Sequence, residues 1–430
     1  MNPRYKKSVE WLNKAERLIP LASQTFSKSK LNFPPGASPL FLERGKGSRV
    51  YDVDGNDYVD FASALLCISL GYQDPDVDEA VREQMKSGVS FSLPHRLEYE
   101  VAERLVDLIP CAEMVRFGKN GTDATSAAIR LARAVTARDH VAVCGYHGWQ
   151  DWYIGSTPRD LGVPEAVKNL THSFSFNDLP SLERVFQACP GSVAAVIVEP
   201  MNLSWPSAGF LEGVRELCTR HGTVLIFDEI ITGFRFHIGG AQSLFGVTPD
   251  LAALGKGMAN GYPLAAVVGK RELMRAMEDI FFSGTFGGET LSLAAARATI
   301  DKMRREPVLQ TIHENGDRLA AGLKDILSSL GSPGFLAVVG HPSWTHLTVG
   351  LGAQHDEWCL KSFILQEMFK KGILCLGQHN LSYAHDQLDV RRILDAYRDI
   401  LPRLIDADQS GSVSTLLDAG VVQPVFKVRA

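Results

Sequence analysis

The chain has 430 residues, of which 45% are hydrophobic and 22% are charged, and its formal net charge is −5. This length suits a large α/β body with appendages or roughly three domains. The acidic balance argues against a general nucleic-acid-binding protein, whose surface would be basic. No apolar run is long enough to span a bilayer, and the basic start at 1–7 lacks the apolar stretch of a signal peptide, so we predict a cytoplasmic protein without nucleic-acid or membrane partners.

The cysteines and histidines show no metal-site spacing. The seven cysteines include no Cys-x-x-Cys pair, which is typical of reduced, mostly buried thiols. His140, His147 and His172 are scattered along the chain. We therefore expect no metal site.

In chain order, the first predicted element is a β-hairpin at 49–60, after a stretch rich in Ser, Pro and Lys. Its two arms flank Asp54-Gly55, a dipeptide typical of tight turns. From there to about residue 300, apolar runs alternate with helical patterns. Strands are predicted at 114–117, 141–143, 193–198, 224–227 and 264–268. Continuous apolar strands separated by helices indicate an α/β fold with a mostly parallel sheet covered on both faces.

After about residue 300 the pattern changes to long helices and short strands. Apolar residues at helical spacing predict one helix around 312–327 and a closing helix around 390–401, with a short strand at 346–349. We therefore assign residues 301–430 to a smaller α+β domain.

A glycine-containing turn at 118–122 lies between a predicted strand and a predicted helix. Such a turn presents free backbone N–H groups at a helix N-terminus, where the helix dipole favours an anion, and Thr122 could add a hydroxyl donor. The turn matches neither the dinucleotide fingerprint nor the P-loop spacing. It predicts a phosphate site or, alternatively, an ordinary helix cap.

Aromatic residues follow the next predicted strand. Tyr146 and Trp149 lie in the segment 145–149. Ligands bind at strand ends in open α/β sheets, so an aromatic side chain there could stack on a planar ring. The alternative is that both are core aromatics.

A carboxylate and a lysine follow two further apolar runs. Asp228 ends the strand 224–227, and Lys256 follows 251–254 between two glycines. These are the two groups needed to hold pyridoxal phosphate, because the lysine forms a Schiff base and the aspartate keeps the pyridine nitrogen protonated. Taken singly, Asp228 could cap a helix or bind magnesium, and Lys256 could be a surface lysine. Their order after the turn and the aromatic favours the cofactor.

Together these features resemble the class-III aminotransferases, which are fold-type-I pyridoxal-phosphate enzymes, and within that class the glutamate-1-semialdehyde 2,1-aminomutase subgroup. The similar stretches cover most of the chain. They are 39–60, 120–122, 128–133, 146–148, 198–200, 227–235, 254–256 and 282–285. The run Asp-Glu-x-x-Thr-Gly-Phe-Arg at 228–235, followed by Gly-Lys at 255–256, is specific to this class.

The resemblance implies a fold-type-I transferase in which 61–300 form the large domain that binds pyridoxal phosphate, and 1–60 join the small domain 301–430. Lys256 would be the catalytic residue, Asp228 would pair with the pyridine N–H, and Ile230 and Tyr146 would pack on the two ring faces. Thr285 would reach the phosphate of a neighbouring subunit, which implies a homodimer. The cofactor-binding residues implied are Asn120, Gly121, Thr122, Tyr146, His147, Glu199, Asp228, Ile230, Lys256 and Thr285.

The reaction implied moves an amino group from a small-molecule donor to an aldehyde or ketone acceptor, through an internal aldimine of Lys256 and pyridoxamine phosphate. Two departures argue against an aminomutase proper. The stretch 23–28 lacks the subgroup's arginine, for which a lysine is a poorer bidentate substitute, and 377–385 lacks the subgroup's acid. We favour transfer between two molecules, with an intramolecular 2,1-aminomutase and a non-catalytic binding protein as the alternatives.

Overall fold

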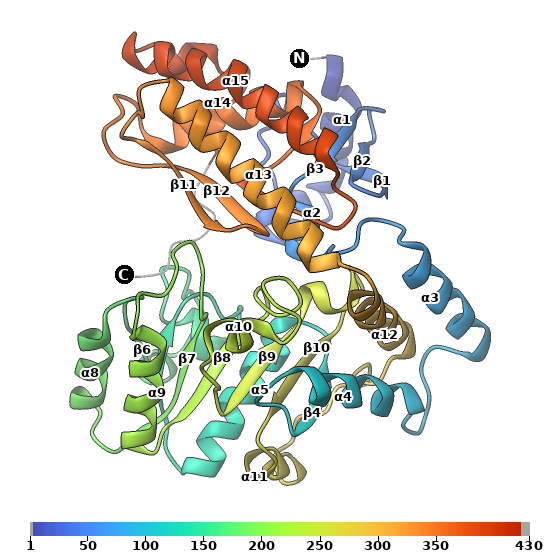
Figure 1. Ribbon diagram of the computed structural model, residues 1–430, viewed down its shortest axis with the longest axis vertical. Helices are drawn as coiled ribbons and strands as arrows, with labels where there is room; N and C mark the ends of the chain where they lie inside the picture. The colour runs from blue at the N-terminus through green and yellow to red at the C-terminus, as the bar shows by residue number, and fades with distance from the viewer. Residues whose placement is uncertain (1–2, 423–430) are drawn as a thin grey trace. The chain divides into compact units, whose positions relative to one another are not determined.

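The computed structural model describes residues 3–422, which form two compact units. The terminal unit contains 3–65, 70–74 and 310–422, and the central unit contains 66–69 and 75–309. Both ends of the described chain therefore belong to the same unit (Figure 1).

The central unit is built on a seven-stranded sheet with the order β4-β10-β9-β8-β7-β5-β6 (Figure 1). Its strands, in that order, are Met114–Gly118, Ala265–Gly269, Leu251–Leu254, Val224–Glu229, Val193–Val198, His140–Cys144 and Thr171–Ser173. Strands β9, β8, β7, β5 and β6 are parallel to one another, whereas β10 is antiparallel to both β4 and β9. The predicted α/β sheet is confirmed as mostly parallel, with β10 as the exception.

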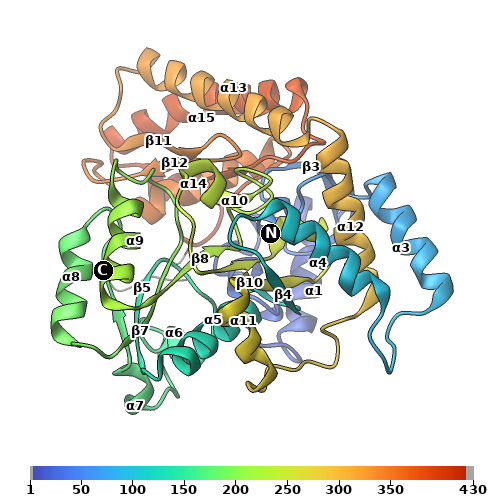
Figure 2. The same cartoon turned by 60° about the horizontal axis from the view of Figure 1, so that its bottom comes forward.

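Helices cover both faces of this sheet (Figures 1 and 2). On one face α5 (Gly121–Thr136), α6 (Asp151–Ile154) and α11 (Arg271–Met274) pack on strand residues such as Val141 and Val143. On the other face α8 (Leu179–Ala188) and α9 (Phe210–His221) pack on the alternate residues Ala142 and Cys144. Because neighbouring side chains point to opposite faces, burial of both faces requires the continuous apolar runs seen in the sequence.

Five further helices of the central unit precede the central strands, connect them or follow them along the chain. The remaining helices of the central unit are α3 (Pro75–Ser87), α4 (Arg96–Leu108), α7 (Glu165–Lys168), α10 (Gly240–Phe245) and α12 (Thr290–Arg305). Helix α12 packs on α3 and α4, and Arg104 of α4 makes a bidentate ion pair with Asp301 of α12 at 2.7 and 2.9 Å.

The terminal unit joins the beginning of the chain to its last third. Its first sheet has the order β1-β2-β3-β13, formed by Leu42–Lys46, Arg49–Asp52, Asp57–Asp60 and Ile373–Leu374. The predicted hairpin is confirmed, because β2 pairs antiparallel with β3. Strand β13 pairs in parallel with β3, Ile373 opposite Val59.

The second sheet of the terminal unit and its three long helices come from the last third of the chain, whereas two short helices come from its beginning. The sheet consists of β11 (Leu336–His341), β12 (Trp344–Val349) and β14 (Gln378–Asn380). The long helices are α13 (Val308–Ser329), α14 (Glu357–Lys370) and α15 (Gln387–Gln409), and the short helices are α1 (Lys6–Ala15) and α2 (Ser63–Leu66). Helices α13 and α15 confirm the two helices predicted there, and β12 contains the predicted short strand. Across residues 3–422, no helix combines the length and the apolar character needed to cross a membrane.

Candidate active site

The predicted site residues follow the carboxyl ends of strands that run in the same direction. Tyr146 and His147 follow β5, Glu199 follows β7, Asp228 lies at the end of β8 and Lys256 follows β9. Strand β4, which precedes the 118–122 turn, runs in the same sense, because it is antiparallel to β10 and β10 is antiparallel to β9. All these segments therefore leave the sheet at one edge, where open α/β sheets bind ligands.

Asp228 is buried and is held by two hydrogen bonds. Its Oδ2 lies 2.8 Å from Nδ1 of His147, and its Oδ1 accepts the backbone N–H of Ile230 at 3.1 Å. An ionised carboxylate can only accept, so this contact suits the histidine tautomer with its proton on Nδ1. The other ring nitrogen of His147, Nε2, is buried without a hydrogen-bond partner among residues 3–422.

The neighbouring acid, Glu229, has a different environment and explains part of the 228–235 motif. Its carboxylate accepts the hydroxyl of Thr232 at 2.5 Å and the backbone N–H groups of Ala241 and Gln242 at 2.6 and 3.0 Å. Burial raises the pKa of Glu229, and these donors act in the opposite direction. The helix-capping role considered for Asp228 therefore belongs to Glu229, at the start of α10.

Ile230 is held between two glycines. A Cβ atom at Gly121 or at Gly255 would lie 3.1 Å from Cδ1 of Ile230, closer than nearly all real contacts of this kind. Because glycine leaves this space open, the turn before α5 and the segment before Lys256 both approach the same side chain. The structure thus brings Gly121, Ile230 and the Lys256 segment together.

The turn before α5 has the features of an anion site. Asn120 is the N-cap residue of α5, and Oδ2 of Asp123 accepts the backbone N–H of Asn120 at 2.8 Å. The hydroxyl of Thr122 is buried and has no hydrogen-bond partner within the described part of the chain. A Cβ atom at Gly148, where φ is +109°, would lie 2.4 Å from that hydroxyl. Glycine at 148 thus allows this loop to pass close to Thr122, and an unpaired hydroxyl donor at a helix N-terminus suits a phosphate group.

Glu199 supports the loop that carries Tyr146. Its Oε2 accepts the backbone N–H of Tyr146 at 2.9 Å and the side-chain amide of Asn202 at 2.8 Å. Burial raises the pKa of Glu199, and the nearby charge of Asp228 raises it further. No motif along the chain predicted the role of Asn202.

Tyr146 and Trp149 are not core residues, because 47% and 65% of their surfaces are exposed. The core alternative for these two aromatics is therefore wrong. The buried aromatic of this loop is Tyr153, whose ring meets that of Tyr146 edge-on at 5.7 Å and whose hydroxyl donates to the carbonyl of Gly145 at 2.7 Å.

Lys256 adopts a backbone conformation that is rare for a residue with a side chain. Its φ is +40°, in the left-handed region, and such strain persists only where the surrounding structure enforces it. Burial lowers the pKa of the Lys256 amine, while Cys67, Asp228 and Glu199 act to raise it. Lys256 is therefore not an ordinary surface lysine.

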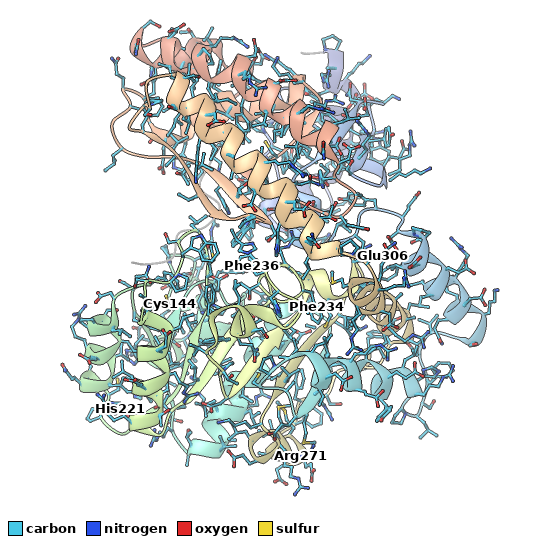
Figure 3. The ribbon with its side chains drawn as sticks, viewed as in Figure 1. Cys144, His221, Phe234, Phe236, Arg271 and Glu306 are labelled. Atoms are coloured by element: carbon cyan, nitrogen blue, oxygen red, sulfur yellow. The ribbon has the colours of Figure 1, made fainter. Side chains whose placement is uncertain are left out.

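Arg235, the last residue of the 228–235 motif, holds the segment that contains Cys67. It is buried, and its guanidinium donates to the carbonyls of Leu66 and Ile68 at 3.3 and 3.4 Å. Burial lowers its pKa to about 10. Phe234 and Phe236 precede and follow Arg235 in the sequence, and both side chains are buried (Figure 3).

Thr285, the remaining predicted site residue, is exposed in the segment between α11 and α12. The structure of one chain therefore shows Thr285 accessible to solvent. It does not place this threonine among the partners of Asp228 or Thr122.

Comparison with known proteins identifies the family. The class-III aminotransferase family model matches residues 33–380, and the chain belongs to this family. It is 35% identical to a 3-aminobutyryl-CoA aminotransferase from Cloacimonas acidaminovorans, over 92% of this chain and 96% of that protein. It is also 37% identical to a glutamate-1-semialdehyde 2,1-aminomutase from Syntrophobacter fumaroxidans, over 84% and 90% of the two chains.

A solved structure gives the same result. The FumI protein of Sphingopyxis sp. MTA144, solved in its pyridoxal-phosphate internal aldimine form, is 28% identical with a TM-score of 0.87, over 94% of this chain and 98% of that one. The chain is therefore a fold-type-I, pyridoxal-phosphate-dependent aminotransferase that moves an amino group from a donor to an aldehyde or ketone acceptor. The predicted family, fold, cofactor and reaction are confirmed.

Proposed function

We propose that Lys256 is the catalytic residue and that the carboxyl edge of the central sheet holds the cofactor. The observation that supports this most directly is the buried Asp228 carboxylate, fixed by His147 at 2.8 Å. Strands β8 and β9 are neighbours, with Glu229 opposite Leu254, so Asp228 and Lys256 leave the sheet from adjacent strands. The unpaired hydroxyl of Thr122 at the N-terminus of α5, which Gly148 approaches closely because it lacks a Cβ, fits a phosphate.

Each residue then has a distinct task. Bound pyridoxal phosphate supplies a ring that withdraws electrons from the substrate's α-carbon. Asp228 would accept a hydrogen bond from the ring nitrogen, and Ile230 and Tyr146 would cover the two ring faces. Thr122 and the N-terminal N–H groups of α5, which follows Asn120, would hold the phosphate.

Lys256 has the chemical task. Its Nζ would hold the cofactor, and as a free amine it would move a proton at the substrate's α-carbon. Burial lowers the pKa of this amine, which favours the neutral form that such a base needs. Glu199 acts through the backbone of Tyr146 and is a positioning residue.

The experiment is a comparison of the purified wild-type protein with Lys256→Ala. The wild type should be yellow and its visible band should shift when an amino donor is added. The variant should lose the wild-type band and the shift. A variant that converted donor at the wild-type rate would overturn the assignment of Lys256, and a co-purified ligand without donor-dependent change would favour the non-catalytic alternative.

We further propose transfer between two molecules rather than within one. The segment 23–28, which lacks the aminomutase subgroup's arginine, lines a cavity of about 360 Å³ in the terminal unit. Within the described part of the chain, the charged residues lining this cavity are Lys28 and Asp60, and no arginine lines it. A substrate without a free carboxylate needs no bidentate arginine. The name of the related 3-aminobutyryl-CoA aminotransferase indicates a coenzyme A thioester as its substrate. Such a substrate has no free carboxylate, which is consistent with the proposed substrate class.

Two measurements test this proposal. An isotopically labelled amino group should pass from the donor to a separate carbonyl acceptor; retention on one carbon skeleton would show the aminomutase alternative. A β-amino acid and its coenzyme A thioester should be compared as donors. A preference for the free acid would contradict the proposed substrate class.

We propose a homodimer in which Thr285 reaches the phosphate of the neighbouring subunit. Large apolar side chains are exposed in the same segment as this threonine, Phe281 at 83% and Phe286 at 59%, and Leu93 of the central unit is 79% exposed. The segment that carries Leu93 is tied to the start of α12 by the hydrogen bond from Thr290 N to the carbonyl of Val89 at 2.9 Å. Such a patch marks an interaction surface. Light scattering should show a dimer, and Phe286→Asp should shift it toward the monomer.

We also propose a cytoplasmic location and the division of the chain into 1–60 with the small domain, 61–300 as the cofactor-binding domain and 301–430 as the small domain. The free state of all seven cysteines, six of them buried, supports a reducing compartment. Cell fractionation tests the location. Limited proteolysis tests the division, since fragments with ends near residues 60 and 300 would support it, whereas a stable fragment of about 75–309 would contradict these bounds.

A further inference from the structure

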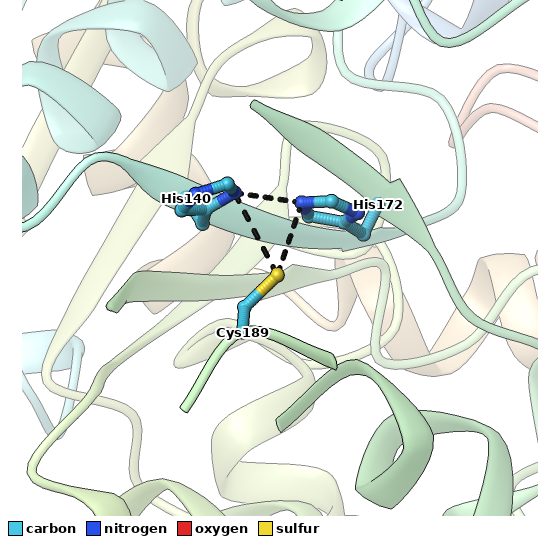
Figure 4. Close-up of side chains that lie close together, drawn as sticks. All are labelled: His140, His172 and Cys189. Atoms are coloured by element: carbon cyan, nitrogen blue, oxygen red, sulfur yellow. Dashed lines mark hydrogen bonds between the residues drawn. The ribbon is translucent and has the colours of Figure 1, made fainter. Parts of the chain in front are cut away.

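Three side chains that can ligate a metal come together at the surface of the central unit, far from the segments described above. His140 begins β5, His172 lies in β6 and Cys189 caps the C-terminal end of α8. Nδ1 of His140 lies 2.8 Å from Nε2 of His172, and Sγ of Cys189 lies 3.7 and 3.5 Å from these two nitrogens, respectively (Figure 4). The expectation that the histidines are too scattered to gather is therefore wrong for His140 and His172.

The sheet explains why these residues meet. Strands β5 and β6 are parallel, with Ala142 opposite His172. His140 is two residues from Ala142 and points to the same face, so both imidazoles lie on the face covered by α8 and α9. The rings stack with centroids 5.0 Å apart. Helix α8 ends on this face, which brings Cys189 to the two rings.

We propose that His140, His172 and Cys189 bind a zinc ion, with a water molecule as the fourth ligand. In a tetrahedral zinc site, metal–ligand bonds of about 2.0–2.1 Å to nitrogen and about 2.3 Å to sulfur separate the two nitrogens by about 3.4 Å and sulfur from nitrogen by about 3.6 Å. The two sulfur–nitrogen distances of 3.5 and 3.7 Å already match this geometry. The two imidazoles need only move apart from their mutual hydrogen bond.

The chemistry of the donors favours zinc over harder cations. One thiolate and two neutral imidazoles are borderline and soft ligands, which suit zinc, whereas magnesium and calcium require oxygen ligands. Binding forms a zinc–sulfur bond and breaks the S–H bond of Cys189, whose proton passes to solvent. The thiol is buried, while both imidazoles are half-buried, which leaves the fourth position open to water from their side.

The location indicates a structural role. His140 is the first residue of β5, whereas Tyr146 and His147 follow the opposite end of the same strand. A strand rises about 3.3 Å per residue, so the metal would lie on the order of 15 Å from the cofactor segments. The ion would join the edge strand β6 and the end of α8 to β5, and it would stabilise the folded chain by mass action without touching the reaction.

The test uses the purified holoenzyme, first treated with a chelator and then given Zn²⁺ in the absence of an amino donor. We expect one zinc ion per chain after gel filtration, and a higher melting temperature with Zn²⁺ than without it. Cobalt should give the intense d–d absorption of a tetrahedral site, at longer wavelength than the cofactor band. Cys189→Ser and His172→Gln should each weaken Zn²⁺ affinity by about a hundredfold or more and abolish the thermal shift, since each removes a ligand.

A matched control distinguishes this site from adventitious histidine binding. His313→Gln changes a half-buried histidine of the terminal unit and should leave zinc binding unchanged. Cys189→Ser and His172→Gln should keep their transaminase activity. This activity would also show that both variants fold. Two outcomes would overturn the proposal: the wild type binds no zinc, or both ligand variants bind zinc as tightly as the wild type. The cluster would then be a hydrogen-bonded pair of imidazoles beside a buried thiol.

Discussion

His147 and Asp228 form a buried pair in which Nδ1 of the imidazole lies 2.8 Å from Oδ2 of the carboxylate. The pair joins the loop after β5 to the end of β8. The carboxylate that we assign to the ring nitrogen of the cofactor is thus oriented by a residue that does not need to contact the substrate.

His147→Gln should lower kcat by about ten- to a hundredfold, because a hydrogen bond to a charged group contributes about 1.5–3 kcal/mol. Asp228→Asn should lower it further, since it removes the carboxylate itself. The rate of the half-reaction with an amino donor, followed by the cofactor's absorption, measures both. Equal rates for His147→Gln and the wild type would show that the pair is not needed for catalysis.

The stability of the cofactor-free protein should depend on the ionisation of Lys256. Burial lowers the pKa of this lysine in the folded chain, whereas an unfolded lysine titrates near about 10.4. Between these two values the unfolded chain binds more protons, so this group's contribution to stability rises as the pH increases through that window. Lys256→Met removes the contribution.

Thermal unfolding of the two apoproteins between pH 7 and pH 10 measures this effect. The melting temperature of the wild type should rise relative to that of Lys256→Met as the pH increases. Lys324→Met, an exposed lysine in α13, should show no such trend. A wild-type advantage that is largest at low pH would contradict the sign of the shift.

Gly148→Ala should weaken cofactor binding. The added methyl group would lie 2.4 Å from the Thr122 hydroxyl, at a φ of +109°. The matched control is Gly162→Ala, where φ is +89° and nothing lies within 4 Å. Both variants bear backbone strain of order 1–3 kcal/mol, so any excess loss of cofactor affinity in Gly148→Ala reports the crowding at Thr122. We expect that excess to be about tenfold or more in the dissociation constant.

Glu229→Gln should affect stability more than chemistry. Its carboxylate accepts two backbone N–H groups and the hydroxyl of Thr232, and an amide can turn only one acceptor oxygen toward these donors. We expect a loss of about 2–4 kcal/mol in the free energy of unfolding, measured by urea denaturation. Glu272→Gln, at an exposed position of α11, should be neutral. A stable Glu229→Gln variant with impaired catalysis would reverse the roles assigned to the two adjacent acids.

The sequence predicted the parts of the fold that depend on apolar periodicity. The strands at 193–198 and 224–227 were predictable because both faces of β7 and β8 are buried. The direction of β10 was not, since an apolar run has the same pattern in a parallel and an antiparallel strand. Strand β6 was missed because Thr171, His172 and Ser173 form a short, polar edge strand.

The same limits apply to the candidate site. Asp228 and Lys256 were found because their residue types follow apolar runs. Their supporting contacts were not, because the Asn202 amide, the Arg235 contacts to Leu66 and Ile68, and the meeting of His140 with Cys189 depend on tertiary packing between segments far apart in sequence. No spacing rule along the chain encodes such contacts.

The parallel pairing of Ile373 with Val59 has a consequence for synthesis on the ribosome. Residues 57–60 are synthesised early, yet the strand that completes their sheet is synthesised more than 300 residues later. The opening segment must therefore stay unassembled while the intervening α/β body folds. A chain truncated before residue 373 would leave β3, near its beginning, without its parallel partner strand. We expect such a chain to depend on chaperones and to aggregate, although the truncation lies near its end.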